Sequence, residues 1–394
     1  MILTQCAVCA TELGLSLGKK CGRCSTRYCG PACQVQHWKE GGHDNLCKKI
    51  KKAGGAEQYN ANTKYTEAVA VAAEACAEDT KGQTCYICTQ AVHWKTKEGL
   101  VRGCACRGTA GFAHVSCLAE QAKILFAEAE ENNLHVKVKQ ARWDRWGRCS
   151  LCEQDYHGVV ACALGWACWK TYVGRPEVHN AHISAMGQLG NCLGAAKHHE
   201  AALSVKETEL SILRRVGARE DRMLVAQTNL AITYQGLGRF EEASRMIGDV
   251  YSGYLRLEGV EHEDTLRAAL NYAISLVKLK RFEEAKALLR KMMPVARRVL
   301  GASHDYTLRM RWNYAETLYK DAGASLAGLR EAVSTLEETE QTARRVLGGA
   351  HPITGGIEKG LQKARAALRA HEEAASGDVS SICGAVEAMT PGDA

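Results

Sequence analysis

The sequence lacks the features that mark membrane and secreted proteins. None of its apolar stretches reaches the ~18 to 20 residues that a membrane span needs, and the longest, Val159 to Trp169, is followed directly by Lys170. The first residues, Met1 to Gln5, have no basic start followed by an apolar run, which predicts that no signal peptide is present. No Asn-x-Ser/Thr sequon occurs either. We therefore expect no membrane span and predict a buried helix over Val159 to Trp169.

Proline is scarce as well, with five in 394 residues. The second half is rich in Ala, Glu, Leu and Arg, which favour helices. A chain of this length is too long for one core and predicts about two to four domains. We expect a mainly α fold.

Cysteine, by contrast, is abundant, with nineteen in the chain. The cysteines come as C-x-x-C pairs joined by histidines at ligand spacing, which is typical of metal sites rather than of disulfides. Together with the missing signal peptide and sequons, this pattern favours a reducing compartment, the cytoplasm and/or the nucleus.

The first group of metal-ligating residues lies in residues 1 to 52. Zinc takes four sulfur or nitrogen ligands in a tetrahedron, so eight ligands predict two sites. Because the gap between Cys24 and Cys29 is short, the ligands have to alternate between the two ions along the chain. His37 is an alternative to His43 as the histidine ligand. The predicted sets are Cys6, Cys9, Cys29 and Cys33 for one ion, and Cys21, Cys24, His43 and Cys47 for the other. So small a segment cannot bury enough apolar surface to fold alone, and metal binding supplies its folding energy.

Tyr28-Cys29-Gly-Pro-Ala-Cys33-Gln34, followed by His37-Trp38 and His43-x3-Cys47, resembles the MYND zinc finger. The family pattern places the ligand at His43. The resemblance implies a protein-interaction domain for short proline-containing peptides, with Gln34 and Trp38 at the peptide face. The alternative is that Trp38 is a core residue. Some MYND fingers accompany lysine methyltransferase domains, but nothing downstream resembles one.

A second series of ligands lies in residues 81 to 158, after a helical, acidic linker over Ala56 to Asp79. Its order is four cysteines, one histidine and three cysteines, with C-x-C and H-x-x-C gaps that chance rarely produces. Cross-braced pairing assigns Cys85, Cys88, His114 and Cys117 to one ion, and Cys104, Cys106, Cys149 and Cys152 to the other. The chain should therefore hold four structural zinc ions.

The stretch from Cys104 to Leu118 resembles the RING-CH, or variant RING, finger. The resemblance implies a ubiquitin ligase without a catalytic nucleophile of its own, which holds a ubiquitin-charged conjugating enzyme beside a substrate. By the same resemblance, Ile87, Ser150 and Leu151 would contact the conjugating enzyme.

Three features depart from the family pattern. Gln121 stands where the family usually has Trp, and Glu153 stands where many active RING fingers have a basic residue. The gap before Cys149 is long, with a helix expected over Leu118 to Glu131 and a short strand over His135 to Val138. Trp143 and Trp146 could replace the missing apolar contact or pack in the core.

The charge of the chain agrees with metal binding. The formal charge is +7, and residues 1 to 52 carry nine Lys and Arg against three Asp and Glu, which is compatible with nucleic-acid binding. Fourteen zinc-bound thiolates and four divalent ions, however, add about −6 and bring the total to about +1. We therefore attribute the basic charge to compensation of the zinc sites and expect no nucleic-acid partner.

Residues 159 to 370 contain internal repeats. Asn229, Asn271 and Asn313 are spaced by 42 residues, and Arg239-Phe-Glu-Glu-Ala returns 42 residues later at Arg281. The motif His262-x-x-Thr returns at His304 and His351. The spacing of apolar residues in each unit predicts two helices with a turn between them. Because one hairpin cannot bury its apolar face alone, neighbouring hairpins should stack into a superhelix.

The repeats resemble tetratricopeptide repeats of the kinesin-light-chain type, with a first helix near Val159 to Val173 and a capping helix over Ile353 to Ala370. The resemblance implies a concave groove that binds proteins or peptides. The backbone of the bound peptide would be hydrogen-bonded by Asn229, Asn271 and Asn313. The alternative is that these asparagines bond neighbouring hairpins.

The predicted order of domains is a MYND-type finger at 1–52, a linker at 53–80, a RING-CH-type finger at 81–158, a repeat array at 159–370 and a flexible tail at 371–394. Two functions follow: a RING-CH-type ubiquitin ligase or ligase adaptor, or a non-catalytic, zinc-dependent scaffold. A role in transcription through the MYND finger is a third hypothesis, and it requires nuclear residence.

Overall fold

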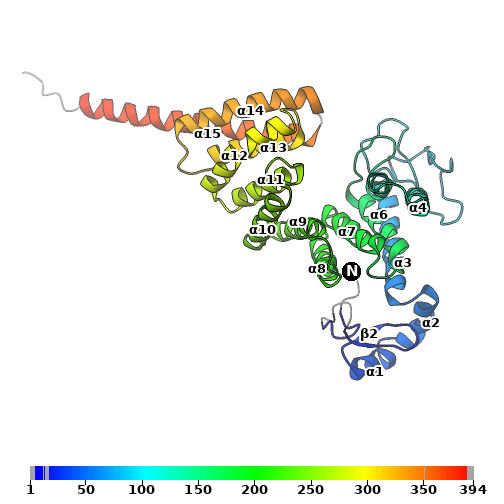
Figure 1. Cartoon of the computed structure of the whole chain (residues 1–394). Coiled ribbons are helices and arrows are strands. Elements are labelled where there is room, and N and C mark those ends of the chain that lie inside the picture. Colours follow the sequence, from blue (N-terminus) through cyan, green and yellow to red (C-terminus); the bar gives the residue numbers. More distant parts are fainter. Residues whose placement is uncertain (1–4, 12, 14–16, 350, 388–394) are drawn as a thin grey trace, which may run out of the picture. The chain divides into compact units, whose positions relative to one another are not determined.

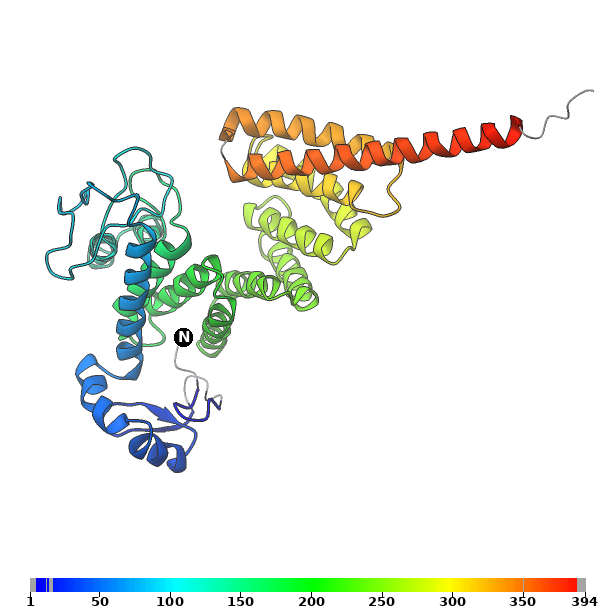
Figure 2. The same ribbon diagram turned by 180° about the vertical axis from the view of Figure 1, so that it is seen from behind.

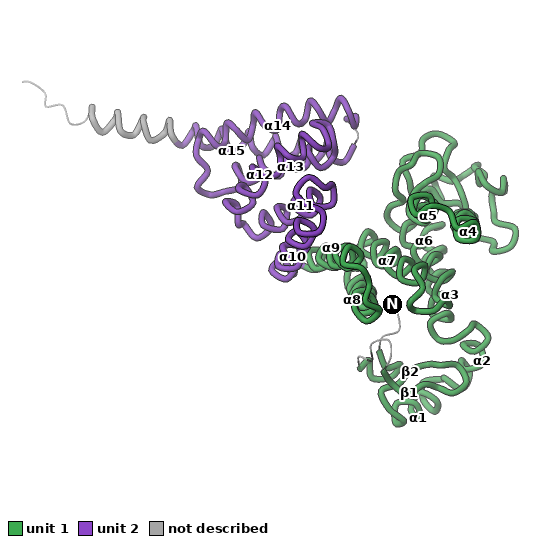
Figure 3. Tube along the Cα trace, viewed as in Figure 1, with its two compact units in different colours: residues 1–237 green, residues 238–394 purple. Residues whose placement is uncertain are grey.

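The computed structural model describes residues 5–11, 13, 17–349 and 351–387, and its side chains up to residue 374. The chain divides into two compact units, residues 1–237 and residues 238–394 (Figure 3). Helices dominate both units, as the composition predicts. None of the helices in the described ranges is long and apolar enough to cross a bilayer.

Unit 1 begins with a small metal-binding module. Its strands β1 (Lys19–Lys20) and β2 (Arg27–Tyr28) form an antiparallel ribbon, followed by helices α1 (Pro31–Lys39) and α2 (His43–Ala53). The buried core of the module consists mainly of cysteines, with three larger side chains: Leu13, Tyr28 and Ile50. Because so few apolar side chains are buried, metal ligation has to supply much of the folding energy.

Helix α3 (Ala56–Ala75) connects this module to the second one, whose helices are α4 (Val115–Glu131) and α5 (Val136–Trp143), with a 3₁₀ turn, η1 (Asp144–Trp146). The strand predicted over His135 to Val138 is wrong. His135 caps a helix instead, since its Nδ1 accepts a hydrogen bond from the Lys137 amide at 3.3 Å.

Helix α6 (Gly158–Tyr172) is the centre of unit 1. It packs against α3, α4 and α7 (Asn180–Ala195), and its residues from Val160 to Trp169 are all buried. Figures 1 and 2 show α3 beside it from opposite sides. Gly165 permits the close approach of α7, because a Cβ there would lie 2.8 Å from the Cys192 Cβ. The connecting helix α3, the second zinc module and the first repeat helix α7 thus all pack on one helix.

Helical hairpins complete both units. In unit 1, α7 packs on α8 (His199–Arg215), and α8 packs on α9 (Glu220–Gly236). Each helix of unit 2 packs on the next, and α13 also contacts α11 and α15. The helices of unit 2 are α10 (Phe240–Glu258), α11 (Glu263–Lys278), α12 (Phe282–Val299), α13 (Asp305–Tyr319), α14 (Leu326–Leu347) and α15 (Pro352–Glu387).

The last helix is longer than the sequence predicts. We expected a capping helix that ends at Ala370, whereas α15 continues to Glu387. The predicted tail over 371–394 thus includes the end of α15, and residues 388–394 lie outside the described residues.

Candidate metal centres and binding surfaces

Cysteine and histidine side chains lie together in four groups of four. Within each group, one ligand atom per residue lies within 4.8 Å of the others. The groups are Cys6, Cys9, Cys29 and Cys33; Cys21, Cys24, His43 and Cys47; Cys85, Cys88, His114 and Cys117; and Cys104, Cys106, Cys149 and Cys152. In both modules the members of the two groups alternate along the chain, which is a cross-braced arrangement.

The distances within these groups fit zinc. A tetrahedral zinc ion with Zn–S bonds of about 2.3 Å separates two sulfur atoms by about 3.8 Å. The Sγ atoms of Cys21 and Cys47 are 3.9 Å apart, and those of Cys106 and Cys149 are 3.8 Å apart. A disulfide would bring them to about 2.05 Å, and the described cysteines are free thiols. The four groups fit four zinc ions.

In the first module, the structure places His43 rather than His37 in the second group. The Nε2 atom of His43, which is completely buried, lies 3.3 Å from the Cys24 Sγ. His37 makes a different contact, because its Nδ1 lies 3.0 Å from the Tyr28 hydroxyl.

In the second module, the Nδ1 atom of His114 faces the sulfur atoms. It lies 3.3 Å from the Cys88 Sγ and 3.6 Å from the Cys117 Sγ. The opposite ring nitrogen, Nε2, lies 3.4 Å from the Ala91 carbonyl oxygen and can donate to it. Such an outer hydrogen bond orients the ring and selects the tautomer whose Nδ1 binds metal.

Each C-x-x-C pair of these modules is followed by a residue with a positive φ angle. Ala10, Ser25, Thr89 and Glu153 have φ angles between 55° and 61°. Their backbone turns let amides point toward the sulfurs: the Ile87 amide lies 3.4 Å from the Cys85 Sγ. The left-handed region costs a non-glycine residue roughly 1 kcal/mol. A backbone hydrogen bond within each turn, such as that from the Ala10 amide to the Cys6 carbonyl oxygen at 3.1 Å, and metal binding offset this cost.

Without an ion, the neighbouring thiols shift one another's pKa values in opposite directions. Hydrogen bonds from Thr11 lower the pKa of Cys9 to about 6, whereas hydrogen bonds with the sulfurs of Cys29 and Cys9 raise the pKa of Cys33 to about 12. One thiolate therefore forms readily and makes the next one unfavourable. A divalent ion reverses this effect, so zinc binding should release protons.

The predicted conjugating-enzyme contacts lie on two neighbouring zinc knuckles. The side chains of Ile87 and Leu151 are 37% and 52% exposed. The residues beside them join the knuckles, because the Tyr86 hydroxyl lies 3.2 Å from the Ser150 Oγ. An exposed apolar side chain is thus present on each knuckle.

Three residues considered with the departures from the RING-CH pattern, Trp143, Trp146 and Glu153, have contacts within the chain. Trp146 is completely buried and belongs to the core, whereas Trp143 is half-buried and packs against Phe126 at a ring distance of 4.8 Å. Glu153 forms an ion pair with Arg145 at 3.0 Å. The acidic charge at this position is therefore partly compensated within the chain.

The predicted peptide face of the first module lies on α1, a helix without buried residues. Trp38 is 44% exposed, and its ring meets the His43 ring edge to face at 5.8 Å. Gln34 lies one turn earlier and is partly buried. Trp38 therefore combines a contact to a predicted zinc ligand with an open surface.

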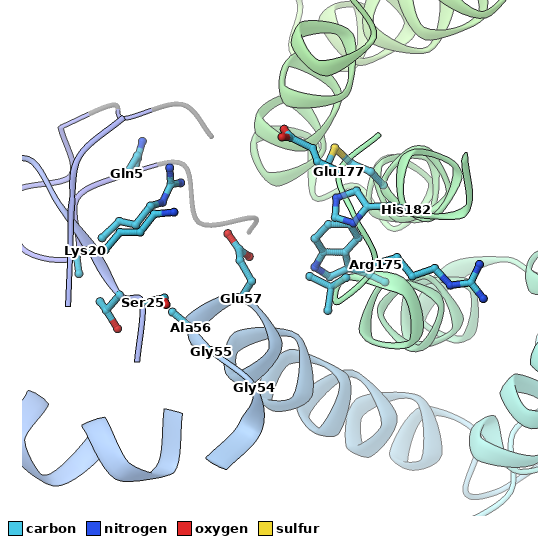
Figure 4. A pocket seen from close by; sticks show the side chains of 16 residues that line it. Gln5, Lys20, Ser25, Gly54, Gly55, Ala56, Glu57, Arg175, Glu177 and His182 are labelled. Carbon is cyan, nitrogen blue, oxygen red and sulfur yellow. The ribbon is translucent and has the colours of Figure 1, made fainter. Parts of the chain in front are cut away.

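A different face of the first module borders a pocket of about 340 Å³ (Figure 4). Lys20 and Ser25 line one side of the pocket, and His182 lines the other, with Glu57 between them. Neither Gln34 nor Trp38 belongs to this lining. The first module thus has two separate faces, one toward α6 and α7 and one on α1.

The three repeated asparagines differ in their contacts. Asn313 is buried, and its Nδ2 donates to the Arg309 carbonyl in the same helix at 2.8 Å. Asn229 and Asn271 are partly buried, and no side-chain hydrogen bond joins them to other described residues. Asn229 lines a cavity of about 400 Å³ and Asn313 one of about 750 Å³. Two of the three positions therefore border cavities on the first helices of their hairpins.

The sequence pattern gave no signal for one pair of buried charges. Lys206 and Glu209 on α8 are 3% and 8% exposed. They follow no motif, and their burial results from the packing of α7 and α9 on α8.

Comparison with protein families confirms the three predicted resemblances. Residues 6–47 match the sequence model of the MYND finger, and residues 85–152 match that of the RING-variant domain. Residues 223–264 and 264–327 match models of the tetratricopeptide repeat. Together with the four metal groups, these matches make the chain a zinc-binding protein built for protein–protein interactions.

Solved structures with similar chains include repeat proteins of the kinesin-light-chain type. The nearly identical TPR-like repeats assigned to a kinesin light chain of Podosopora anserina are 18% identical, with 59% of this chain and 97% of that chain covered and a TM-score of 0.39. BtubC (BKLC) from P. vanneervenii is 13% identical, with 71% and 93% covered and a TM-score of 0.36. Comparison with curated protein sequences gives no match.

Proposed function

We propose that this chain is a RING-variant ubiquitin ligase, or the adaptor of one, which selects partners through its helical repeats and its MYND finger. The observation that carries the proposal is the pair of exposed apolar side chains, Ile87 and Leu151, on two knuckles linked through Tyr86 and Ser150. The match of residues 85–152 to the RING-variant domain supports the same surface.

The chain would contribute no atom that forms a covalent bond. A conjugating enzyme carries ubiquitin as a thioester, a lysine amine of the target attacks the carbonyl carbon, and the enzyme thiolate leaves. The ligase raises the effective concentration of the two reactants and restricts their orientation. The four zinc ions are structural in this scheme, because each has four protein ligands and no open position.

The proposed partners are proteins. The basic charge of the first module compensates its own thiolates, so the proposal includes no nucleic acid. Gln34 and Trp38 on α1, and Asn229, Asn271 and Asn313 in the repeats, are the proposed peptide contacts. The exposed ring of Trp38 and the cavities beside Asn229 and Asn313 support these assignments.

An autoubiquitination assay tests the ligase function. The full chain, loaded with zinc, is incubated with ubiquitin, activating enzyme and a panel of conjugating enzymes. We expect activity with at least one of them, and a loss of about tenfold or more in Ile87→Ala, because a central apolar contact is removed. Val71→Ala removes another exposed apolar side chain, from α3, and should have no effect. Inactivity across the whole panel would refute the ligase function.

A non-catalytic scaffold is the second candidate, favoured by Gln121 and by the ion pair between Glu153 and Arg145. The variant Glu153→Arg separates the two. In a ligase whose activity is limited by this acidic position, the substitution should raise autoubiquitination several-fold. In a scaffold, wild type and variant are both inactive, while peptide binding by the repeats persists.

A further inference from the structure

A cavity of about 400 Å³ in unit 1 combines the first repeat helices with the edge of the second zinc module. Helices α7, α8 and α9 contribute Gln188, Glu209 and Asn229, and the zinc module contributes Asp144 and Arg148. The cavity is therefore the part of the repeat surface that lies beside the RING-variant domain.

Glu209 is the unusual side chain of this cavity. It is 8% exposed, and its Oε2 is shielded from solvent and has no hydrogen-bond partner among the described residues. Its carboxylate lies against Gly187 of α7, where a Cβ would come within 2.7 Å of Oε1. Any other residue at position 187 would displace the carboxylate, so the glycine creates the space that it occupies.

The nearby cations interact with other groups. Lys206 donates from Nζ to the Asn229 carbonyl oxygen and to the Thr233 hydroxyl, both at 3.0 Å. Arg222 donates to the Asn180 side-chain oxygen at 2.6 Å. Neither cation forms an ion pair with Glu209 within the described part of the chain. Glu209 is thus a buried carboxylate without a bonded counter-ion.

Such a group is unfavourable for folding. A buried carboxylate oxygen that lacks a hydrogen bond, as Oε2 does here, loses its hydration without compensation. Burial accordingly raises the pKa of Glu209 to about 7, in spite of the opposing charges of Lys206 and Arg222. The charged carboxylate thus lowers the stability of the folded chain. A cation that pairs with it would recover the free energy lost with its hydration.

A second cavity continues the first. It has a volume of about 1200 Å³ and shares lining residues with the first, among them Trp143, Leu213 and Arg222. Its lining includes Val136 and Val178, which are 70% and 66% exposed. We refer to the two adjoining cavities together as the groove: Glu209 lines only the first cavity, and Val136 and Val178 line only the second.

We propose that this groove binds an extended segment of a partner protein that places a lysine or arginine side chain on Glu209 and apolar side chains against Val136 and Val178. The inference rests on the proposed function of the repeats as a peptide-binding surface. Charge complementarity selects the occupant, because a cation beside the buried carboxylate replaces the hydration that its charged form has lost. The groove then holds the target beside the RING-variant domain, within the same compact unit.

A selection experiment tests the proposal. The full zinc-loaded chain is used to select binders from a library of short random peptides, and the dissociation constants of the selected peptides are measured for wild type and variants. Glu209→Gln removes the charge at constant shape. Glu200→Gln removes the same charge from an exposed position on the same helix and is the matched control. Thermal unfolding verifies that each variant is folded.

We expect selected peptides that share a lysine or arginine, bind Glu209→Gln at least about tenfold more weakly, and bind Glu200→Gln as they bind wild type. Replacing their basic residue by glutamine should weaken binding to wild type but not to Glu209→Gln. Peptides that lose affinity for Asn229→Ala but not for Glu209→Gln would overturn the role of Glu209 while supporting peptide binding. If no selected peptide responds to either variant, both the inference and the peptide-binding function of this groove are wrong.

Discussion

Single residues of this chain bury charge in two different ways. The thiolates of Cys21, Cys24 and Cys47 are buried, and a divalent ion can neutralise them. Glu209 is also buried, but its Oε2 has no hydrogen-bond partner in the described part of the chain. The first arrangement stabilises the fold when zinc is present, whereas the second reduces stability until a ligand is bound.

The Glu209→Gln variant should therefore be more stable than wild type, and increasingly so as the pH rises. A carboxyl whose pKa is raised from 4.5 to about 7 binds its proton more tightly in the folded state. It consequently lowers stability as the pH rises through that window. Glutamine does not titrate. Thermal unfolding at about pH 6 and pH 8 should show a gain that grows toward pH 8, with a ceiling of roughly 3.4 kcal/mol. An equal gain at both pH values would contradict this account.

The turns after the zinc knuckles lead to another prediction for single residues. Ala10, which is exposed, has a φ angle of 56°. Ala10→Gly should slow the release of zinc to a chelator, because glycine adopts this angle at roughly 1 kcal/mol lower cost. Ala10→Val should accelerate release, since a β-branched side chain tolerates the angle least. The same release rate in all three proteins would mean that the turn is not strained.

At the level of helices, the repeated histidines have a structural role. His179, His262, His304 and His351 precede α7, α11, α13 and α15, and each accepts a hydrogen bond through Nδ1 from the amide two residues later, at 3.1 to 3.3 Å. The repeat of His-x-x-Thr thus marks helix starts. Arg239 and Arg281 pair with Glu242 and Glu284 in the first turns of α10 and α12.

Replacing one such cap should destabilise unit 2. His304→Ala removes the acceptor for the Tyr306 amide and should cost about 1 kcal/mol, whereas His304→Asn should retain most of the stability, because asparagine is a good N-cap. Denaturant unfolding, followed by the helical circular dichroism signal, measures both. A loss of equal size in the two variants would assign the effect to the ring contact with Tyr306 instead.

Helices also show where sequence patterns are insufficient. Val136 and Val138 suggested a strand, yet they lie in the first turn of α5, which His135 caps. The start of α4 was predicted three residues late, at Leu118 instead of Val115. Its first turn is held by Glu98, whose Oε1 accepts from the Ser116 amide at 2.7 Å. A local cap decided the first outcome, and a contact between distant segments decided the second.

For the whole molecule, the two units should respond differently to removal of zinc. All four metal groups lie within unit 1, between Cys6 and Cys152, whereas unit 2 has its own core of leucine, alanine and methionine side chains. Native mass spectrometry should show four zinc ions per chain. After chelation, hydrogen exchange should accelerate throughout residues 5–158 and remain slow in α11 to α14. Exchange that accelerates equally in unit 2 would contradict its independent stability.

The sequence by itself determined the features that depend on local spacing: the four metal groups, the two finger types and the 42-residue repeats. Metal binding requires particular residues at short intervals, and stacked hairpins repeat their apolar positions. Both features can therefore be recognised from residue spacing in the sequence. Only the tertiary structure showed that Glu209 is buried against Gly187 with no partner for its Oε2 among the described residues, and that Trp146 packs in the core. Burial, pairing of charges and the shape of a groove depend on segments that come together only on folding. The spacing of residues along the chain does not indicate them.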